Sequence, residues 1–354
     1  MKVVLFTPGL ITGGAEMMAA RLAASLANEQ INLEVICLSK EQNTFNEKKI
    51  QDKGIKIYYL NKNSGASIKT IFKAWKLLNK IKPDVIHSHI SGTIYSIPWV
   101  MFHKCKLVHT IHTKPDVEFS KKITNIFKFM LKRKKMILVA VSKENHKIAK
   151  EFYKFGDDRI KYVNNPVEIE NYYQDQNRNE ENVVFINVSR QDPNKNQIMM
   201  INAFAEVIKK NNKVRLKLVG DGNQHQNLIS RAKELDISEY VDFLGEKSNV
   251  EDYLSKADIY LSTSHREGLP LSMLEAMASR LPIISTNVGG IPDLIDGNGI
   301  LIEDDNVDQL VEAMLSLSSN TELRKIYGDK SYEIAKNFDS KKCAINYIKI
   351  YQGE

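Results

Sequence analysis

Residues 2–28 read KVVLFTPGLITGGAEMMAARLAASLAN, and this stretch decides the class of fold. Residues 2–6 form an apolar run typical of a parallel strand that is buried on both faces. A loop with paired glycines follows, and the alanine-rich residues 15–28 favour a helix. A strand, a glycine loop and a helix in this order suit a phosphate site, because the helix start offers free backbone N–H groups.

The same alternation continues along the chain. Apolar runs at residues 33–38, 55–60, 84–87, 107–110 and 137–141 alternate with helical patterns, among them residues 68–81 and 143–155. A second series begins at Val183, and its strands read VVFINV, VRLKLVG, YVDFLG, DIYLS, PIIST and GILI. We therefore predict an α/β chain with two Rossmann-like, doubly wound parallel-sheet domains that face a central cleft.

The length of 354 residues suits two domains of similar size. The stretch QDQNRNEEN at residues 174–182 is polar and lacks periodicity, which predicts a linker. We expect an N-terminal domain at residues 1–175 and a C-terminal domain at residues 176–339. A last helix at about residues 340–354 is expected to pack back on the first domain.

Composition excludes several classes of protein. A hydrophobic fraction of 43% and a charged fraction of 26% are those of a soluble globular chain. No apolar run reaches about 18 residues and the N-terminus lacks a signal peptide, so we expect a cytoplasmic protein. Three scattered cysteines, Cys37, Cys105 and Cys343, have no metal-ligand spacing, which excludes a disulfide framework and a zinc site of cysteines.

The most informative local motif is REGLPLSMLEAMA at residues 266–278, which follows the strand DIYLS. Glu267 precedes the predicted helix, Glu275 lies inside it, and Pro270 suits the first helical turn. One carboxylate would grip a sugar and the other a ribose diol. Backbone N–H groups near the helix start would receive an anion or a sugar hydroxyl: those of Gly268, Leu269 and Leu271. The alternative is an ordinary amphipathic helix with solvated glutamates.

A second motif, VSRQDPNKN at residues 188–196, also follows a strand and precedes a helix. Arg190 and Lys195 would bind a diphosphate, stabilise it as a leaving group and replace a metal ion. Alternatively they are loop charges without a ligand. Two further loops, GDG with Asp221 and FLGEKSNV with Lys247, are predicted to contribute to the same ligand site.

The loop TGGAE at residues 12–16 opens the first helix. Gly13 and Gly14 would let the backbone approach a ligand closely, and a tight packing turn is the alternative. The loop is not a complete G-x-G-x-x-G and lacks the G-K-[ST] ending of a Walker loop, which argues against ATP hydrolysis.

Four histidines end two predicted strands, in DVIHSH and LVHTIHT. Such side chains would overhang the cleft and donate to a sugar hydroxyl or to an acceptor, whereas the alternative is a histidine in the core. We predict no metal site, because His87 and His89 are expected on alternate faces and no carboxylate pattern completes a ligand set. His112, just past its strand, is expected to be less buried than His87, His89 and His109.

Taken together, these residues resemble the family 4 retaining glycosyltransferases of the GT-B fold. The resemblance rests on GGAE, the histidine after the fifth strand, the Arg190 and Lys195 pair, GDG, and EGLPLSMLEAMA followed by VGG, in this order over nearly the whole chain. Two segments depart from the family pattern. VNNPVE replaces the common V-P-N-G-V, and His265-Arg266 replaces an aromatic residue before the first glutamate.

The resemblance implies that the N-terminal domain binds the acceptor and the C-terminal domain binds the donor. It also implies roles for individual residues. Arg190 and Lys195 would bind the donor diphosphate, and Glu275 the ribose hydroxyls. Glu267 and the amides of residues 268–271 would face the donor sugar and its phosphate. His112 would lie close to the transferred sugar, while Gly13, Gly14 and Glu16 shape the reaction centre; we place the acceptor near Glu16 and His89.

The resemblance also implies a reaction. We expect a retaining, metal-independent transferase without a cofactor, which moves a sugar from a nucleotide-sugar to a glycan or lipid-linked acceptor. A UDP-sugar donor and a place in bacterial surface polysaccharide or glycolipid synthesis are family expectations. The alternatives are a nucleotide-sugar epimerase of the same fold and a non-catalytic nucleotide-sugar-binding scaffold.

The formal net charge of +7 is concentrated in a cluster at residues 121–135, with no acidic residue between Phe119 and Lys143. The same segment places apolar residues at helical spacing: Ile123, Ile126, Phe127, Met130 and Leu131. A helix of this kind would lie on an anionic membrane and make the protein peripheral on its inner face. The alternative is a surface helix with a core-facing stripe, and nucleic acid is disfavoured because stacking aromatics are not interleaved.

Overall fold

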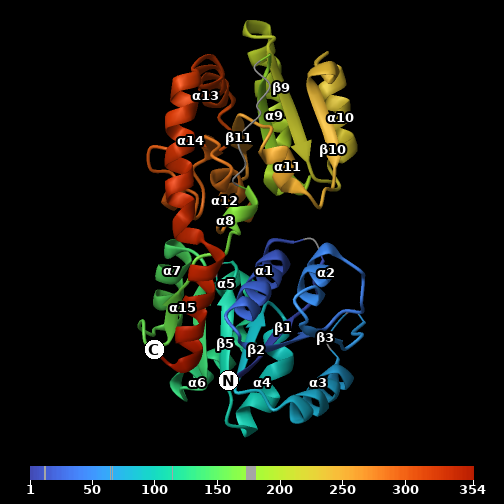
Figure 1. Cartoon of the computed structure of the whole chain (residues 1–354), viewed down its shortest axis with the longest axis vertical. Helices are drawn as coiled ribbons and strands as arrows, with labels where there is room; N and C mark the ends of the chain where they lie inside the picture. The colour runs from blue at the N-terminus through green and yellow to red at the C-terminus, as the bar shows by residue number, and fades with distance from the viewer. Residues whose placement is uncertain (12, 64, 66, 114, 173–180) are drawn as a thin grey trace. The chain divides into compact units, whose positions relative to one another are not determined.

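The computed structural model describes residues 1–11, 13–63, 65, 67–113, 115–172 and 181–354. Met1–Pro166 together with Ser340–Glu354 form one compact unit, here unit 1, and Val167–Asp339 form unit 2 (Figure 1). The predicted domain boundary at residues 175 and 176, and most of the predicted linker, lie outside the described residues.

Unit 1 contains a parallel sheet with the order β3-β2-β1-β4-β5-β6-β7. Its strands are β1 (Lys2–Thr7), β2 (Asn32–Cys37), β3 (Lys56–Tyr59), β4 (Val85–His89), β5 (Lys106–Ile111), β6 (Met136–Ala140) and β7 (Ile160–Tyr162). Sequence periodicity predicted six of these strands. It missed β7, because a strand of three residues is too short to show an alternating pattern.

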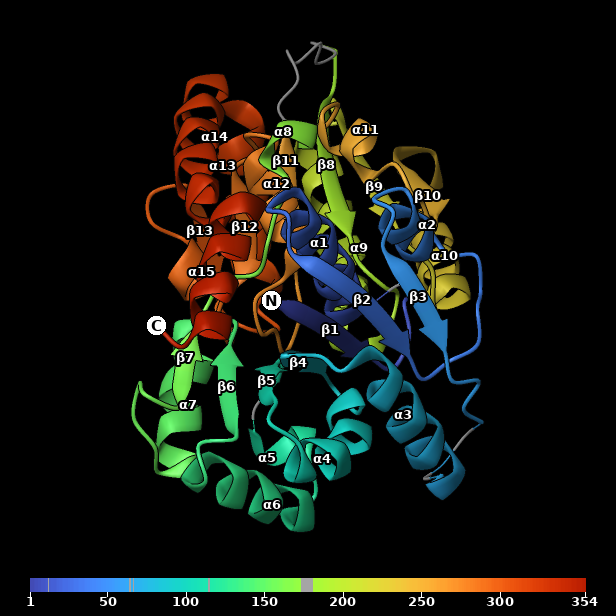
Figure 2. The same ribbon diagram turned by 60° about the horizontal axis from the view of Figure 1, so that its bottom comes forward.

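Helices cover both faces of this sheet. They are α1 (Gly14–Asn28), α2 (Phe45–Gln51), α3 (Ile68–Ile81), α4 (Gly92–Phe102), α5 (Pro115–Glu118), α6 (Lys121–Lys132), α7 (Lys143–Tyr153) and α15 (Ser340–Gln352). Val4 and Phe6 of β1 point into a core shared with α3, α4, α6 and α7. Their neighbours Val3 and Leu5 are equally buried on the opposite face, where α1 and α15 pack against each other (Figure 2).

The C-terminal helix α15 is fastened to unit 1 by buried polar contacts. The Tyr351 hydroxyl lies 2.7 Å from His87 Nδ1, and the Tyr347 hydroxyl lies 3.1 Å from Thr110 Oγ1. Lys106 Nζ also donates to the Tyr351 carbonyl at 2.8 Å. Because these groups are buried, leaving them unpaired would be costly, so the contacts specify where α15 packs.

Unit 2 repeats the architecture with the strand order β10-β9-β8-β11-β12-β13. Its strands are β8 (Val183–Val188), β9 (Val214–Val219), β10 (Val241–Gly245), β11 (Ile259–Ser262), β12 (Ile283–Thr286) and β13 (Gly299–Ile302). Its helices are α8 (Ile169–Tyr172), α9 (Gln197–Lys210), α10 (His225–Glu234), α11 (Val250–Leu254), α12 (Leu271–Ala278), α13 (Val307–Ser319) and α14 (Thr321–Ala335). The prediction of two doubly wound parallel sheets is therefore confirmed.

The strand orders also say where ligands should bind. The direction of winding reverses between β1 and β4 in unit 1, and between β8 and β11 in unit 2. Loops leaving the carboxyl ends of such a pair diverge to opposite faces and leave a crevice. The motifs around Gly13, Arg190 and Glu267 all follow one of these strands.

Helix α6 divides its apolar residues between the core and the surface. Phe127, Met130 and Leu131 are buried in the core, whereas Ile126 and Phe129 are 41% and 47% exposed. The core-facing stripe therefore exists, and a second pair of apolar side chains faces outward. None of the helices that the structure describes combines the length and apolarity needed to cross a bilayer.

Candidate active site

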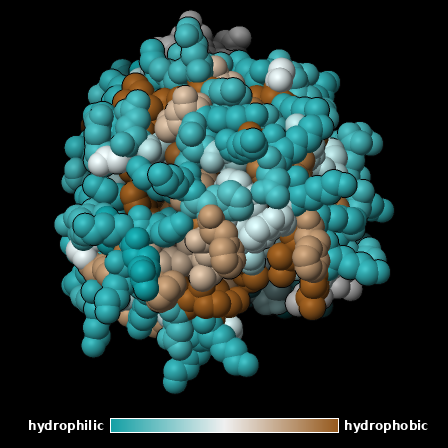
Figure 3. Space-filling view, turned by 90° about the horizontal axis from the view of Figure 1, so that it is seen from below, coloured by the Kyte–Doolittle hydropathy of each residue, from teal (hydrophilic) through white to brown (hydrophobic). Residues whose placement is uncertain are grey.

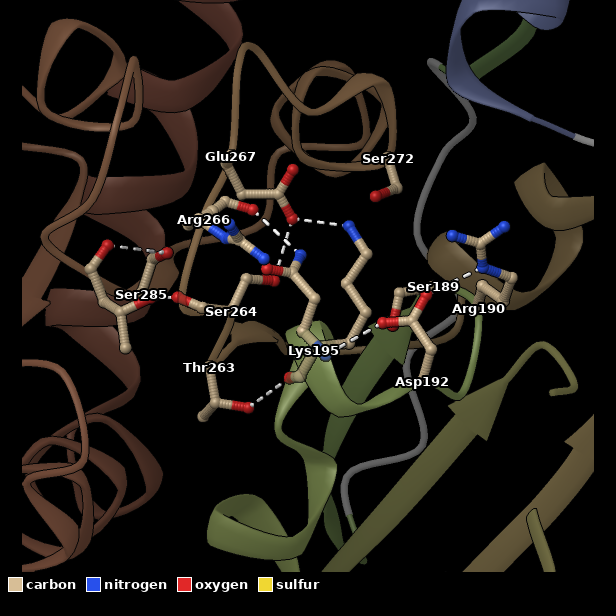
Figure 4. Close-up of polar contacts among 12 residues, drawn as sticks. Ser189, Arg190, Asp192, Lys195, Thr263, Ser264, Arg266, Glu267, Ser272 and Ser285 are labelled. Carbon is tan, nitrogen blue, oxygen red and sulfur yellow. Dashed lines mark hydrogen bonds and ion pairs between the residues drawn. The ribbon is translucent and has the colours of Figure 1, made fainter. Parts of the chain in front are cut away.

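The loop after β8 and the loop after β11 meet through an ion pair. Lys195 Nζ lies 2.6 Å from Glu267 Oε1, and the two side chains are only 22% and 11% exposed. Figure 4 shows the lysine side chain pointing toward the glutamate carboxylate. Ser264 Oγ donates to the same carboxylate oxygen at 2.8 Å, so the position of Glu267 is held from two directions.

Backbone contacts fasten the same two loops together. Thr263 Oγ1 donates to the carbonyls of Lys195 and Asn196 at 3.0 and 2.9 Å. In addition, His265 N donates to the Asn194 carbonyl at 2.8 Å. Sequence reasoning missed Thr263 and Ser264, because small hydroxyl residues in a loop carry no pattern until their partners are known.

Arg190, like Lys195, lies in the loop after β8, but its side chain pairs with Asp192. Its Nε donates to Asp192 Oδ2 at 2.7 Å, while the side chain is 73% exposed. The short contact to Asp192 fixes the stem and leaves most of the guanidinium surface open to solvent. A guanidinium held in this way can bind an anion in a bidentate manner.

Helix α12 starts beside this ion pair. The sequence placed Pro270 inside the first turn, but Pro270 is the N-cap and the helix begins at Leu271. Free N–H groups at the helix start still favour an anion. Glu275, expected to face a ligand, is 1% exposed in the structure, whereas Ser272 at the helix start is half-buried.

Two glycines allow backbones to meet at this site. A Cβ on Gly289 would lie 1.8 Å from the Glu267 carbonyl oxygen, and Gly290 N donates to the Gly268 carbonyl at 3.1 Å. Similarly, a Cβ on Gly220 would lie 2.0 Å from the Ser189 carbonyl oxygen. The glycines of VGG and GDG therefore let neighbouring loops support the residues that carry the charges.

The remaining predicted site residues lie on loops or at a helix start within their own units. Asp221 is 62% exposed, and its carboxylate accepts from Gly222 N at 2.6 Å. Lys247 is half-buried in the loop between β10 and α11. In unit 1, α1 begins at Gly14 with Gly13 as its N-cap, and Glu16 lies in the first turn.

The expectation that His87 and His89 face opposite sides of the sheet is wrong. Residues i and i+2 of a strand share a face, and the two rings lie with their centroids 4.5 Å apart. On this face His87 is bonded to Tyr351 and, through Nε2, to Thr110 Oγ1 at 2.8 Å. His87 is therefore a fully buried part of the α15 attachment.

His89 and His112 form a pair at the carboxyl ends of β4 and β5. His89 Nδ1 lies 3.0 Å from His112 Nε2, so one ring donates and the other accepts. His89 is fully buried, while His112 is half-buried, as the sequence predicted for a residue past the strand end. Burial holds the pKa of His89 well below its usual range and lowers that of His112 to about 4, so both rings are neutral near pH 7.

His109 faces the other side of the sheet. Its Nδ1 lies 2.5 Å from Thr93 Oγ1, and its Nε2 lies 3.1 Å from Glu118 Oε1. This fully buried ring also packs on Phe119 and Phe127, as expected for a histidine in the core. Among the described residues, the one group close enough to share a metal ion is His265, Asp304 and Asp305, in which both aspartates are exposed.

Comparison with protein families identifies the chain. Residues 12–171 match the model of Glycosyltransferase Family 4, and residues 168–334 match that of Glycosyl transferases group 1. The chain is a family 4 glycosyltransferase. The prediction made from the ordered motifs is confirmed, and this glycosyltransferase has the two-sheet architecture expected of the GT-B fold.

Individual relatives extend the match over most of the glycosyltransferase. The N-acetyl-α-D-glucosaminyl L-malate synthase of Bacillus anthracis is 27% identical over 292 residues, covering 76% of this chain and 74% of the relative. The UDP-Gal:α-D-GlcNAc-diphosphoundecaprenol α-1,3-galactosyltransferase of Escherichia coli is 24% identical and covers 88% and 86%. The structure of Anabaena HepE in complex with UDP-glucose is similar in fold, with a TM-score of 0.85, 19% identity and full coverage of both chains.

Proposed function

We propose that this glycosyltransferase is retaining and metal-independent and transfers a sugar from a UDP-sugar to a glycan or lipid-linked acceptor, in the synthesis of a bacterial surface polysaccharide or glycolipid. The observation that carries the proposal is the Lys195–Glu267 ion pair beside the start of α12. With the exposed guanidinium of Arg190, this edge of unit 2 offers two cations and a helix start for a nucleoside diphosphate.

Relatives support the donor and the acceptor class. The E. coli relative is named for a UDP-galactose donor and a diphosphoundecaprenol-linked acceptor, and HepE was solved with UDP-glucose. The sugars named for these two proteins differ, whereas both nucleotides are UDP, so the relatives indicate the nucleotide of the donor better than its sugar. We therefore extend the UDP donor and the lipid-linked acceptor class to this chain.

In the proposed reaction, Arg190 and Lys195 hold the diphosphate and stabilise its negative charge as the bond to the anomeric carbon breaks. The acceptor hydroxyl forms the new bond on the face from which the diphosphate leaves, which retains the anomeric configuration. Its proton passes to an oxygen of the departing phosphate. A neutral His112 would donate to or accept from a hydroxyl of the transferred sugar rather than supply charge.

Calorimetry in EDTA tests the donor site, with UDP-, GDP- and ADP-glucose as probes. We expect binding of the UDP-sugar alone, weakened about tenfold or more in Arg190→Ala and Glu275→Ala. Lys209→Ala is a matched control, since Lys209 forms an exposed surface pair with Glu206. Binding that disappears in EDTA and returns with a divalent ion would contradict the metal-independent mechanism.

Product analysis tests the reaction. NMR of the product should show the anomeric configuration of the donor, with nucleoside diphosphate released in proportion to glycosylated acceptor. A covalent glycosyl-enzyme trapped in mass spectra would refute same-face attack. Conversion of the donor sugar without any acceptor would instead identify an epimerase, and binding without turnover a scaffold.

A further inference from the structure

The net positive charge of this chain is concentrated in one part of unit 1. Residues 53–135 contain 18 Lys and Arg but three Asp and Glu, so this segment carries +15 against +7 for the whole chain. Two of the three acidic groups are already engaged within the protein. Asp84 accepts from Lys2 N at 2.7 Å, and Glu118 pairs with the buried His109.

Exposed apolar side chains gather on helices of the same segment. Ile68 and Phe72 of α3 are 74% and 71% exposed, and Phe102 at the end of α4 is 77% exposed. Ile126 and Phe129 of α6 are the outward pair described above. Exposed cations flank these side chains: Lys69, Lys76, Lys80, Lys104, Lys121, Lys122, Lys132, Arg133 and Lys134.

Contacts join the three helices into one surface. The Trp75 ring of α3 lies 5.8 Å from the Phe102 ring of α4. Lys135, which follows α6, donates to the carbonyls of Val100, Met101 and His103 at the end of α4, at 3.1, 3.3 and 2.9 Å. Figures 1 and 2 place α3, α4 and α6 on the same end of unit 1, and Figure 3 shows apolar side chains gathered among hydrophilic ones there.

We propose that this face, formed by the outward side chains of α3, the end of α4 and α6, docks on an anionic lipid membrane. The proposal deepens the proposed function, since a lipid-linked acceptor would be presented at that membrane. Docking on the membrane does not itself depend on binding of the donor. Apolar side chains would enter the headgroup region while the lysines contact anionic lipids.

The charge pattern favours lipid over other occupants. A symmetric contact with a second copy would place these cations against themselves, which opposes association. Nucleic acid would be drawn by the charge, but it offers no environment for exposed Ile68 and Ile126. An anionic membrane satisfies both the apolar and the cationic side chains. Because α3 contributes as much as α6, the surface is wider than the helix that the sequence singled out.

Vesicle flotation tests the proposal with the intact chain. We expect binding to phosphatidylglycerol–phosphatidylcholine vesicles at 0.1 M salt, weakened about tenfold at 0.5 M salt, and little binding to phosphatidylcholine alone. Phe72→Ser with Phe102→Ser, and separately Lys69→Glu with Lys76→Glu, should each weaken binding about tenfold or more. All four side chains are exposed, so the fold should be retained.

Matched controls lie on unit 2. Ile326→Ser, at a side chain 53% exposed on α14, and Lys209→Glu with Lys210→Glu, at the end of α9, should leave vesicle binding unchanged. Calorimetry with UDP on the same variants separates this surface from the donor site. Binding to DNA as strong as to vesicles, a dimer lost in the α3 variants, or equal effects of the test and control substitutions would each overturn the proposal.

Discussion

Three histidines of unit 1 predict a loss of stability in mild acid. Their pKa values in the folded state are lowered by burial: to about 4 for His112, and well below the usual range for His87 and His89. In the unfolded chain each should titrate near pH 6.5. Because the unfolded state then binds more protons, stability is fully present above about pH 6.5 and decreases as the pH falls toward 4.

The size of the effect follows from these values. At pH 5.5 an unfolded histidine of pKa about 6.5 gains about 1.4 kcal/mol from protonation, whereas a folded ring of pKa about 4 gains almost nothing. His112 would therefore lower the free energy of unfolding by about 1.4 kcal/mol between pH 7.5 and pH 5.5, and His87 and His89 act in the same direction. Most small domains have about 5–15 kcal/mol in total, so a change of this size is measurable.

Tryptophan fluorescence isolates this effect, because both tryptophans of the chain, Trp75 and Trp99, lie in unit 1. Guanidinium unfolding would be followed at pH 7.5 and 5.5 for the wild type, His89→Gln and His112→Gln. His112→Gln should lose about 1.4 kcal/mol of the pH dependence, and His89→Gln should also reduce it. A wild type equally stable at both pH values, or variants with the same pH dependence as the wild type, would refute the reasoning.

Three further predictions concern the site. Gly289→Ala should lower donor affinity about tenfold or more, since the new Cβ would collide with the Glu267 carbonyl. Gly297→Ala is the control, because Gly297 also has a positive φ but has open space around it. Equal losses of affinity in the two variants would show that backbone strain alone is responsible. Lys195→Met should reduce kcat about 100-fold with an unchanged circular dichroism spectrum, and full activity would exclude a role in stabilising the leaving group. His89→Gln should lower kcat more than it weakens UDP binding, because the substitution perturbs the position of the His112 ring, which is hydrogen-bonded to His89. An equal loss of UDP affinity in calorimetry would contradict this prediction.

Much of the donor edge followed from local sequence. Each motif sits directly after a buried strand, and the carboxyl ends of parallel strands share one edge of a sheet. That rule placed Arg190, Lys195 and Glu267 together before any contact was known. It was silent on Thr263 and Ser264, because a hydroxyl in a loop gains meaning only from the group that it faces across the fold.

The four histidines at the ends of β4 and β5 show where reasoning from the sequence alone failed. His87, His89, His109 and His112 look alike along the chain, yet the pleat of β4 and β5 sends three of them to the face of α15 and His109 to the other. The helix that pairs with His87 lies more than 250 residues away in sequence. No local pattern encodes such a partner, because it exists only after the chain returns to unit 1.

The sequence by itself determined the alternation of strands and helices, the two parallel sheets and the family, since these depend on hydrophobic periodicity and on motifs at strand ends. Tertiary structure alone decided which side chains meet: the Lys195–Glu267 pair, the His89–His112 pair and the shared surface of α3, α4 and α6. The physical reason is that periodicity specifies which side of an element is buried, whereas partners are chosen by how distant elements pack.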